Sequence, residues 1–375
     1  MPGLLPDVDP DGLLEYSVVY TDRSLNHMSR RFQQVMRDVS ATLKEVYGAK
    51  SAVLVPGSGS TGMEAVARQF GGGQRCLIVR NGWFSYRWTQ ILEMSGIAPD
   101  PMVLKARRVG EGPRAPFAPA PVEEVVAAIR SFKPAVVFAP HVETSAGMIL
   151  PDAYIRAVAD AVHAEGGLLV LDCIASGAEW VDMRATGVDL LISAPQKGWS
   201  STPCTGIVML SELARARIDA TQSSSFSLDL KKWLSIMETY ENGAHAYHAT
   251  LPTDGLVHLR DAMAELRAFG FERARQAQRE IGGRVRTLLA ARGVPSVAAP
   301  GFEASGVFVG YTDRDDWQNT RAFAAQGLQT AAGVPLACDE GPDYKSFRLG
   351  LFGLDKWQHP DRTVDTFTRA LDAVG

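Results

Sequence analysis

Short apolar runs alternate with segments of helical periodicity between about residues 40 and 210. A continuous run of four to six apolar residues predicts a strand that is buried on both faces, whereas apolar residues spaced three and four apart predict an amphipathic helix. We expect strands at 51–55, 76–79, 135–138, 167–172, 188–193 and 206–210, and helices at 63–70, 122–132 and 153–164. This alternation predicts an α/β fold with a mainly parallel sheet covered by helices on both faces.

The remainder of the chain follows a different pattern. A long helical stretch over 258–290 leads into two further apolar runs, 306–310 and 347–351, which predict a smaller α+β unit. A Pro-, Gly- and Arg-rich piece, 107–121, is typical of a surface loop. The length of 375 residues suits about two domains. We therefore expect an N-terminal arm at 1–24, a large domain at 25–268 and a small C-terminal domain at 269–375.

Composition excludes several classes of protein. Hydrophobic residues make up 46% of the chain, but no apolar run approaches the roughly 18–20 residues that span a membrane. The formal net charge of −4 and the lack of a basic cluster argue against nucleic-acid binding. The N-terminus lacks a basic segment followed by a long apolar one, so we expect no signal peptide. The four cysteines are scattered without a CxxC pair, which favours reduced thiols in a cytoplasmic protein and no metal site.

An aspartate and a lysine follow two of the predicted strands. Asp172 ends the run 167–172, and Lys197 lies just beyond the run 188–193. Side chains at the carboxyl ends of neighbouring strands in such a sheet face one crevice. Pyridoxal phosphate chemistry needs a lysine for the Schiff base and a carboxylate that keeps the ring nitrogen protonated. Either residue alone is common on a surface or at a helix end, so the assignment depends on the rest of the site.

A glycine-rich turn supplies another part of such a site. Gly57-Ser-Gly-Ser-Thr61 lies between the strand at 51–55 and the helix at 63–70. Backbone N–H groups and hydroxyls there would meet a phosphate at the positive end of the helix dipole. No lysine follows the glycines, so a nucleotide-binding P-loop is disfavoured.

Seven short motifs then occur in one order along the chain. They are Gly57-Ser-Gly-Ser-Thr61, Asn81-Gly-Trp-Phe-Ser-Tyr-Arg87, His141-Val-Glu-Thr-Ser-Ala-Gly147, Asp172-Cys-Ile-Ala-Ser176, Gln196-Lys-Gly198, Tyr247-His-Ala-Thr-Leu-Pro252 and Phe347-Arg-Leu-Gly350. Because it carries these motifs in this order, the chain resembles the class V, fold-type I pyridoxal-phosphate-dependent aminotransferases from about residue 25 to its end. Within that family it looks like the alanine–glyoxylate and serine–pyruvate aminotransferase branch.

The resemblance implies a role for each matching residue. Lys197 would form the Schiff base and then carry the proton, and Asp172 would pair with the ring nitrogen. The remaining cofactor contacts would be Ser60, Thr61 and Gln196 at the phosphate, Thr144 near the ring's 3-oxygen, and Phe84 and Ile174 on the two ring faces. Tyr247 and Thr250 match residues that reach the phosphate of the neighbouring subunit, which implies a homodimer with shared active sites.

Arg348 matches the arginine that binds the substrate α-carboxylate in this family. A planar guanidinium makes two parallel charge-assisted hydrogen bonds to a carboxylate and so fixes the orientation of an amino acid. The resemblance therefore implies a transaminase with a ping-pong cycle. Alanine or serine would be the amino donor, and glyoxylate or pyruvate the acceptor.

The chain also departs from the family pattern. Residues 15–27 replace a Pro-Gly-Pro segment, and Tyr16, Tyr20 and His27 could contact substrate or belong to a docked arm. Phe84 stands where relatives often carry Trp. The acidic segment 338–344 before Arg348 is expected to form a mobile loop near the site, with no role assigned.

Three alternatives remain at this point. One is a 2-aminoethylphosphonate transaminase, which would need extra cationic or hydroxyl groups at the pocket mouth. Another is a cysteine desulfurase or lyase, for which Cys338 is the only candidate nucleophile, but relatives of that kind carry His where this chain has Gln196. The third is a non-catalytic pyridoxal-phosphate-binding protein of the same fold.

Overall fold

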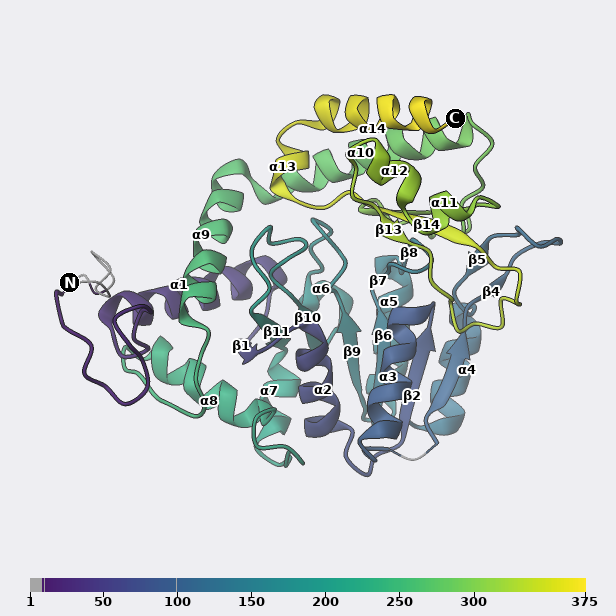
Figure 1. Cartoon of the computed structure of the whole chain (residues 1–375). Helices are drawn as coiled ribbons and strands as arrows, with labels where there is room; N and C mark the ends of the chain where they lie inside the picture. The colour runs from purple at the N-terminus through teal and green to yellow at the C-terminus, as the bar shows by residue number, and fades with distance from the viewer. Residues whose placement is uncertain (1–8, 10, 99) are drawn as a thin grey trace.

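A computed structural model describes residues 9, 11–98 and 100–375 (Figure 1). Residues 1–8 and 10 of the expected N-terminal arm lie outside the described residues. Among the helices of the described part, none is long and apolar enough to cross a membrane.

A seven-stranded sheet forms the centre of the larger part, with strand order β1-β11-β10-β9-β6-β2-β3. Its strands are β1 (Ser51–Pro56), β2 (Cys76–Arg80), β3 (Met102–Lys105), β6 (Val136–Pro140), β9 (Leu168–Asp172), β10 (Leu190–Ser193) and β11 (Thr205–Leu210). Most of their residues are buried on both faces, as their continuous apolar runs predict. The strands expected from the sequence are confirmed to within a few residues.

One strand of this sheet runs against the others. β11 pairs antiparallel with β1 on one side and with β10 on the other, whereas β10, β9, β6, β2 and β3 pair parallel. β1 and β10 therefore point the same way. The reversed strand that the family resemblance implied at 206–210 is confirmed.

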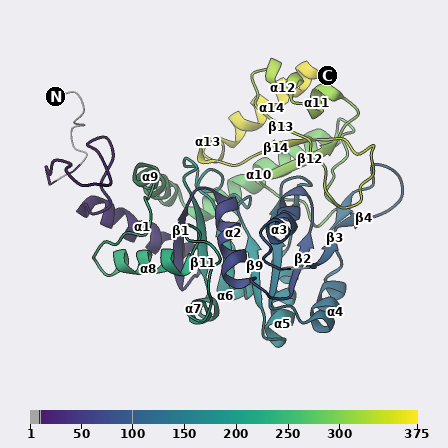
Figure 2. The same ribbon diagram turned by 60° about the horizontal axis from the view of Figure 1, so that its bottom comes forward.

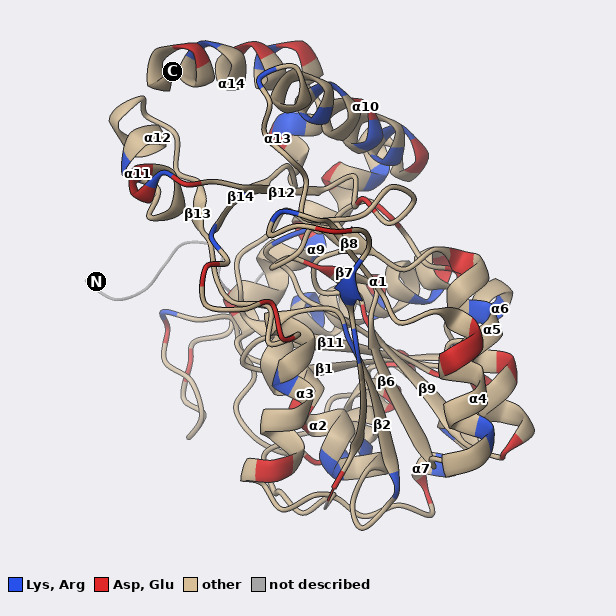
Figure 3. Ribbon diagram, turned by 90° about the vertical axis from the view of Figure 1, so that its right-hand side faces the viewer, with Lys and Arg blue, Asp and Glu red and all other residues tan. Residues whose placement is uncertain are grey.

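Helices cover both faces of the sheet. Figure 3 shows α2 and α3 on one side and α4, α5 and α6 on the other. The helices of this part are α1 (Arg30–Tyr47), α2 (Gly59–Phe70), α3 (Trp83–Met94), α4 (Val122–Phe132), α5 (Asp152–Ala164), α6 (Met183–Thr186), α7 (Glu212–Ile218), α8 (Leu230–Glu241) and α9 (Thr253–Phe269). The helices expected at 63–70, 122–132 and 153–164 are confirmed, and the first of them begins four residues earlier.

The C-terminal part lies above the central sheet in Figure 1. It contains an antiparallel sheet of order β12-β14-β13, with helices on its outer side. Its elements are α10 (Phe271–Ala290), β12 (Val307–Tyr311), α11 (Asp315–Gln318), α12 (Arg321–Ala325), β13 (Ala331–Ala332), β14 (Ser346–Gly350), α13 (Leu354–Trp357) and α14 (Pro360–Val374). This is the smaller α+β unit that the sequence predicts.

Two expectations about local structure are wrong. The helical stretch 258–290 is two helices, because Gly270 takes a positive φ of 104° between α9 and α10, which a helix cannot continue through. The piece 107–121 is not wholly irregular, since β4 (Arg107–Arg108) pairs with β5 (Phe117–Ala118). A similar short ribbon joins β7 (Val142–Glu143) to β8 (Met148–Ile149).

The segment before α1 is held against the start of α9. The Tyr20 hydroxyl donates to the Leu251 carbonyl at 3.0 Å, and the Leu25 N–H donates to Asp254 Oδ1 at 3.2 Å. Figure 2 shows residues 11–29 near α1 and α9, to one side of the sheet. Tyr16 is 90% exposed there, so within one chain it is not a wall of a substrate pocket.

Candidate active site

Five loops meet at one edge of the central sheet. β1, β2, β6, β9 and β10 run the same way, so the residues that follow them gather at the same carboxyl edge. These residues are Ser58–Thr61 after β1, Asn81–Arg87 after β2, His141–Thr144 after β6, Asp172 at the end of β9 and Lys197 after β10. Five of the seven sequence motifs are thereby brought to one place.

Asp172 and Lys197 lie close enough to influence each other's ionisation. Asp172 is 7% exposed, and its Oδ1 accepts the Ile174 N–H at 2.9 Å. Burial raises the pKa of the Asp172 carboxyl to about 6, although the Ile174 N–H and the Lys197 charge act against that rise. Burial lowers the pKa of the Lys197 ammonium, and the nearby Arg348 and Arg87 charges lower it further. A lower pKa shifts the balance toward the unprotonated amine, which is the form that attacks a carbonyl.

The glycine-rich turn forms an open helix start. The Ser58 N–H donates to Thr61 Oγ1 at 3.0 Å, which closes the first turn of α2. Gly59 lies against Ile174, since a Cβ at residue 59 would come within 2.5 Å of Ile174 Cδ1. The first N–H groups of a helix lack partners within the helix, so this turn can receive an anion.

Glu143 fixes the start of α3, on which Phe84 lies. Its buried carboxylate accepts five hydrogen bonds, from the N–H groups of Phe84, Ser85 and Ser145 and from the hydroxyls of Ser85 and Ser145, at 2.7–3.2 Å. Gly82 makes this approach possible, because a Cβ at residue 82 would lie 2.1 Å from Ser145 Oγ. The negative carboxylate also suits the positive end of the helix.

Two arginines approach the ring of Phe84. The Cζ atoms of Arg87 and Arg348 lie 5.3 and 5.4 Å from its centroid. Arg348 Nε donates to the Ala332 carbonyl at 2.7 Å, and burial lowers the pKa of the Arg348 guanidinium. Neither arginine forms an ion pair with a carboxylate in the described part of the chain. Both are therefore suited to meet an anionic ligand.

Two acidic side chains of the loop before Arg348, which was expected to be mobile, make contacts in this structure. The Glu340 carboxylate accepts the N–H groups of Leu336, Ala337 and Cys338. Lys105 Nζ binds both oxygens of Asp339, at 2.8 and 2.9 Å. These contacts occupy two of the acidic groups of the segment, so its acidity opposes carboxylate binding at Arg348 less than its composition suggests.

The other expected cofactor residues differ in their surroundings. Thr144 is buried in the turn between β7 and β8, whereas Gln196 is exposed beside Lys197. Tyr247 and Thr250 belong to the connection between α8 and α9. Tyr247 is 53% exposed, and among the described residues these two side chains hydrogen-bond to each other at 3.1 Å. Among the described residues, neither side chain has a hydrogen bond or ring contact to the group around Lys197.

Three residues of the site were not predicted. Arg87 and Glu143 lie inside motifs that carry the family resemblance, so a cation and an acid within those motifs are the signal by which the sequence could indicate them. Phe352 lies just beyond β14, and Lys197 Nζ is 5.8 Å from the centroid of its ring. Nothing in the local sequence marks Phe352.

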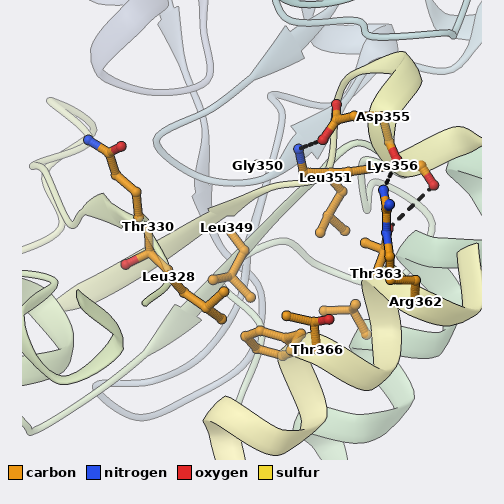
Figure 4. Close-up of a pocket in the computed structure, with 13 residues that line it drawn as sticks. Leu328, Thr330, Leu349, Gly350, Leu351, Asp355, Lys356, Arg362, Thr363 and Thr366 are labelled. Atoms are coloured by element: carbon orange, nitrogen blue, oxygen red, sulfur yellow. Dashed lines mark hydrogen bonds and ion pairs between the residues drawn. The ribbon is translucent and has the colours of Figure 1, made fainter. Parts of the chain in front are cut away.

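A separate cavity of about 240 Å³ lies on the other face of β14 (Figure 4). Leu349 and Leu351 line it, whereas Arg348 approaches Phe84, as the alternation of side chains along a strand requires. Leu328 and Phe367 complete its apolar wall. None of the predicted site residues lines this cavity, so it is distinct from the candidate active site.

The residues at the sheet edge fit pyridoxal phosphate. A weakly basic lysine, a buried carboxylate and an open helix start with hydroxyls are the groups that the aldehyde, the ring nitrogen and the phosphate require. Gly59 at the helix start contacts Ile174, and the Ile174 N–H donates to Asp172. Ile174 thus connects the helix start with the buried carboxylate.

Comparisons with known proteins agree with this geometry. A family model described as "Aminotransferase class-V" matches residues 13–308. Alanine–glyoxylate aminotransferase of Callithrix jacchus is 26% identical over 360 residues, which cover 92% of this chain and 81% of the relative. 2-Aminoethylphosphonate–pyruvate transaminase 2 of Paraburkholderia xenovorans is 30% identical over 329 residues, 86% of this chain and 84% of the relative.

The solved structure of alanine–glyoxylate aminotransferase from Nostoc sp. superposes with a TM-score of 0.78 at 20% sequence identity, covering 93% of this chain and 88% of that one. The family match, the relatives that align over more than four fifths of their length and the shared fold all lead to one assignment. The chain belongs to the class V aminotransferases, enzymes of fold type I that depend on pyridoxal 5′-phosphate.

Proposed function

We propose that this aminotransferase moves an amino group from a small amino acid, alanine or serine, to a small 2-oxo acid, glyoxylate or pyruvate, by a ping-pong cycle. The likeness to alanine–glyoxylate aminotransferases over 92% of the chain supports this choice of substrates. The proposal includes a homodimer with shared sites, a cytoplasmic location, and the division into an arm, a large domain at 25–268 and a small domain at 269–375.

One observation carries the proposal. Arg348 extends from β14 toward the pocket, lies over Phe84 and affects the ionisation of Lys197, and no carboxylate of the described residues pairs with it. Burying a guanidinium without a counter-ion costs free energy. A substrate carboxylate would supply that counter-ion and would be held with its α-carbon toward Lys197.

The side chains around the cofactor each have a proposed task. Pyridoxal phosphate, when bound, supplies an aldehyde that captures amines and a ring that accepts the electrons of the α-carbon bond. Lys197 Nζ would hold and move the α-proton, and Asp172 would pair with the ring nitrogen. Phe84 and Ile174 would cover the ring. Thr144 would lie near the 3-oxygen, and Ser60, Thr61 and Gln196 would bind the phosphate.

The neighbouring subunit would complete the phosphate site. Tyr247 and Thr250 are exposed and hydrogen-bond to each other, so their hydroxyls are at the surface of a single chain. His27 lies beside them, with its ring centroid 5.5 Å from that of Tyr247. We propose that this surface meets the second copy and that the two hydroxyls reach its phosphate.

Absorption spectroscopy tests the proposal directly. The purified protein should show a visible band from the bound cofactor. L-Alanine alone should convert this band to a near-ultraviolet one, and glyoxylate or pyruvate should restore it. A visible band that does not respond to alanine or serine would contradict the proposed donors while keeping the cofactor.

A 2-aminoethylphosphonate transaminase is the second candidate, favoured by the relative at 30% identity. The same assay separates the two, because only this candidate converts the band with 2-aminoethylphosphonate. Alanine does not separate them, since transfer of the amino group to pyruvate forms alanine and the reverse of that step converts the band in either enzyme. A cysteine desulfurase is disfavoured. Cys338 is buried, and burial raises the pKa of its thiol to about 12, which withholds the thiolate nucleophile.

A further inference from the structure

Arg87 joins two parts of the site that belong to different helices. It lies on α3, three residues after Phe84 and therefore on the same face of that helix. Its Nη1 donates to Ser60 Oγ at 2.8 Å, and its Cζ lies 5.3 Å from the Phe84 ring centroid. Within the described residues no carboxylate forms an ion pair with it. Arg87 is thus a cation that contacts a hydroxyl at the start of α2.

The chemistry of this hydrogen bond decides what Ser60 can do. A guanidinium only donates, so Ser60 Oγ is the acceptor and its own proton is left for another partner. Thr61 differs, because its Oγ1 accepts the Ser58 N–H and lies 3.3 Å from Ser58 Oγ, which can take its proton. Arg87 therefore makes Ser60 a hydrogen-bond donor for a ligand at the helix start.

Charge at this position acts in the same direction. The first turn of α2 presents N–H groups and the positive end of the helix dipole. The Arg87 charge also lowers the pKa of both Lys197 and Asp172, so it reaches the centre of the pocket. An anion at the start of α2 would meet the dipole, a donating hydroxyl and this cation together.

We propose that Arg87 is a positioning residue for the cofactor phosphate, acting through Ser60 and through its own charge. The inference rests on the proposed assignment of Ser60 to the phosphate. It sets Arg87 apart from Arg348, since Arg87 serves the cofactor and Arg348 serves the substrate, with Phe84 between them. If the Arg87–Ser60 hydrogen bond only held α2 to α3, substitution of Arg87 would affect phosphorylated and unphosphorylated ligands alike.

The test compares ligands with and without the phosphate. Apoprotein is titrated with pyridoxal 5′-phosphate and, separately, with pyridoxal, and the dissociation constants are measured by equilibrium dialysis. Arg87→Met should weaken binding of pyridoxal 5′-phosphate roughly 10- to 100-fold, the range for a charge-assisted hydrogen bond, and leave pyridoxal binding unchanged. Arg87→Lys should lose less affinity for pyridoxal 5′-phosphate, because an ammonium is also a cation that only donates hydrogen bonds.

A double substitution tests the route through Ser60. If Arg87 acts through that hydroxyl, Ser60→Ala should add little to the loss already caused by Arg87→Met. Arg75→Met is the matched control, since Arg75 lies 4.4 Å from the centroid of Phe132 and is not part of the site. It should bind both ligands as the unsubstituted protein does.

Three outcomes would count against the proposal. Equal weakening of both ligands by Arg87→Met would make Arg87 a structural tie. Fully additive losses in the double variant would remove the route through Ser60. Unchanged affinity for pyridoxal 5′-phosphate in Arg87→Met would reject any role at the phosphate. Failure of the unsubstituted protein to bind pyridoxal 5′-phosphate would instead overturn the cofactor assignment itself.

Discussion

Asp172 and Lys197 attract each other, yet burial outweighs that attraction for both. The pKa of the Asp172 carboxyl rises to about 6, and the pKa of the Lys197 ammonium falls. Without a cofactor the pair is therefore drawn toward its neutral forms. A cationic ring nitrogen beside Asp172 would favour the carboxylate, so the pocket is arranged for a ligand that brings its own positive charge.

Substitution of Lys197 should remove both the anchor of the cofactor and the proton carrier. Lys197→Ala should abolish the visible cofactor band and lower the rate of transamination by at least about 10²- to 10⁴-fold, the usual contribution of a positioned acid–base group. Stopped-flow absorption measures both. Lys133→Ala, at a surface ion pair with Glu165, is the control and should behave normally. Near-normal turnover of Lys197→Ala would defeat the assignment.

Substitution of Arg348 should impair substrates and spare the cofactor. Arg348→Ala leaves a carboxylate without its bidentate partner, a cost of about 2–4 kcal/mol, or roughly 30- to 1000-fold in kcat/KM. The KM should rise for the amino acid and for the oxo acid alike in steady-state assays. Loss of bound pyridoxal phosphate in this variant would move Arg348 to the cofactor site and refute the substrate model.

The buried Asp172 carboxyl should make the apoprotein less stable at high pH. Its folded pKa of about 6 exceeds the ordinary value of 3.8, so the folded state holds the proton more tightly. The loss in the free energy of unfolding that this carboxyl causes is small near pH 4. It grows as pH rises and reaches about 3 kcal/mol above pH 6. Urea unfolding should show Asp172→Asn stabilised at pH 8 and progressively less so toward pH 4. An equal gain at every pH would exclude ionisation as the cause.

Glu143 should be essential for the start of α3. Glu143→Gln replaces one accepting oxygen by a donating amide, which leaves buried N–H and hydroxyl groups unpaired at a cost of about 2–4 kcal/mol. We expect a lower urea midpoint and weaker cofactor binding, because Phe84 loses its support. Glu93→Gln, at an exposed position on the same helix, should change stability by no more than about 0.5 kcal/mol. Similar behaviour of the two variants would contradict the anchoring role.

Subunit mixing tests the shared site. Lys197→Ala and Tyr247→Ala homodimers should each be impaired, the second through weaker cofactor binding. If Tyr247 serves its neighbour, a mixed dimer contains one site with both substitutions and one intact site. Activity should therefore reappear after the two variants are unfolded and refolded together. No recovery in verified mixed dimers would mean that Tyr247 serves its own chain or none.

Much of the fold could be predicted because the central strands carry continuous apolar runs of four to six residues, which are typical of strands buried on both faces. Asp172 and Lys197 could be found for the same reason, since each follows such a run. The break at Gly270 could not be predicted from the hydrophobic pattern, because the apolar spacing continues across it and only the backbone angle ends the helix.

The rest of the site depends on contacts between distant segments. Phe352 reaches Lys197 from 155 positions further along the chain, and Arg87 meets Ser60 from another helix. The contact between Lys105 and Asp339 likewise appears only when β3 and the loop before β14 are side by side. No local pattern encodes such pairings. In the proposed dimer, the surroundings of Tyr247 depend further on a second copy of the chain.

The reversed strand β11 also governs when the protein can become functional during synthesis. In the described sheet, β1 is at the edge and pairs only with β11, more than 140 residues later. A nascent chain therefore carries an unpaired β1 until residues 205–210 have left the ribosome. The helix start that follows β1 gains a fixed place only then, after Asp172 and Lys197 have been made. Such long-range pairing slows folding. Cofactor capture should accordingly be a late event, and truncated chains ending before β11 should not retain it.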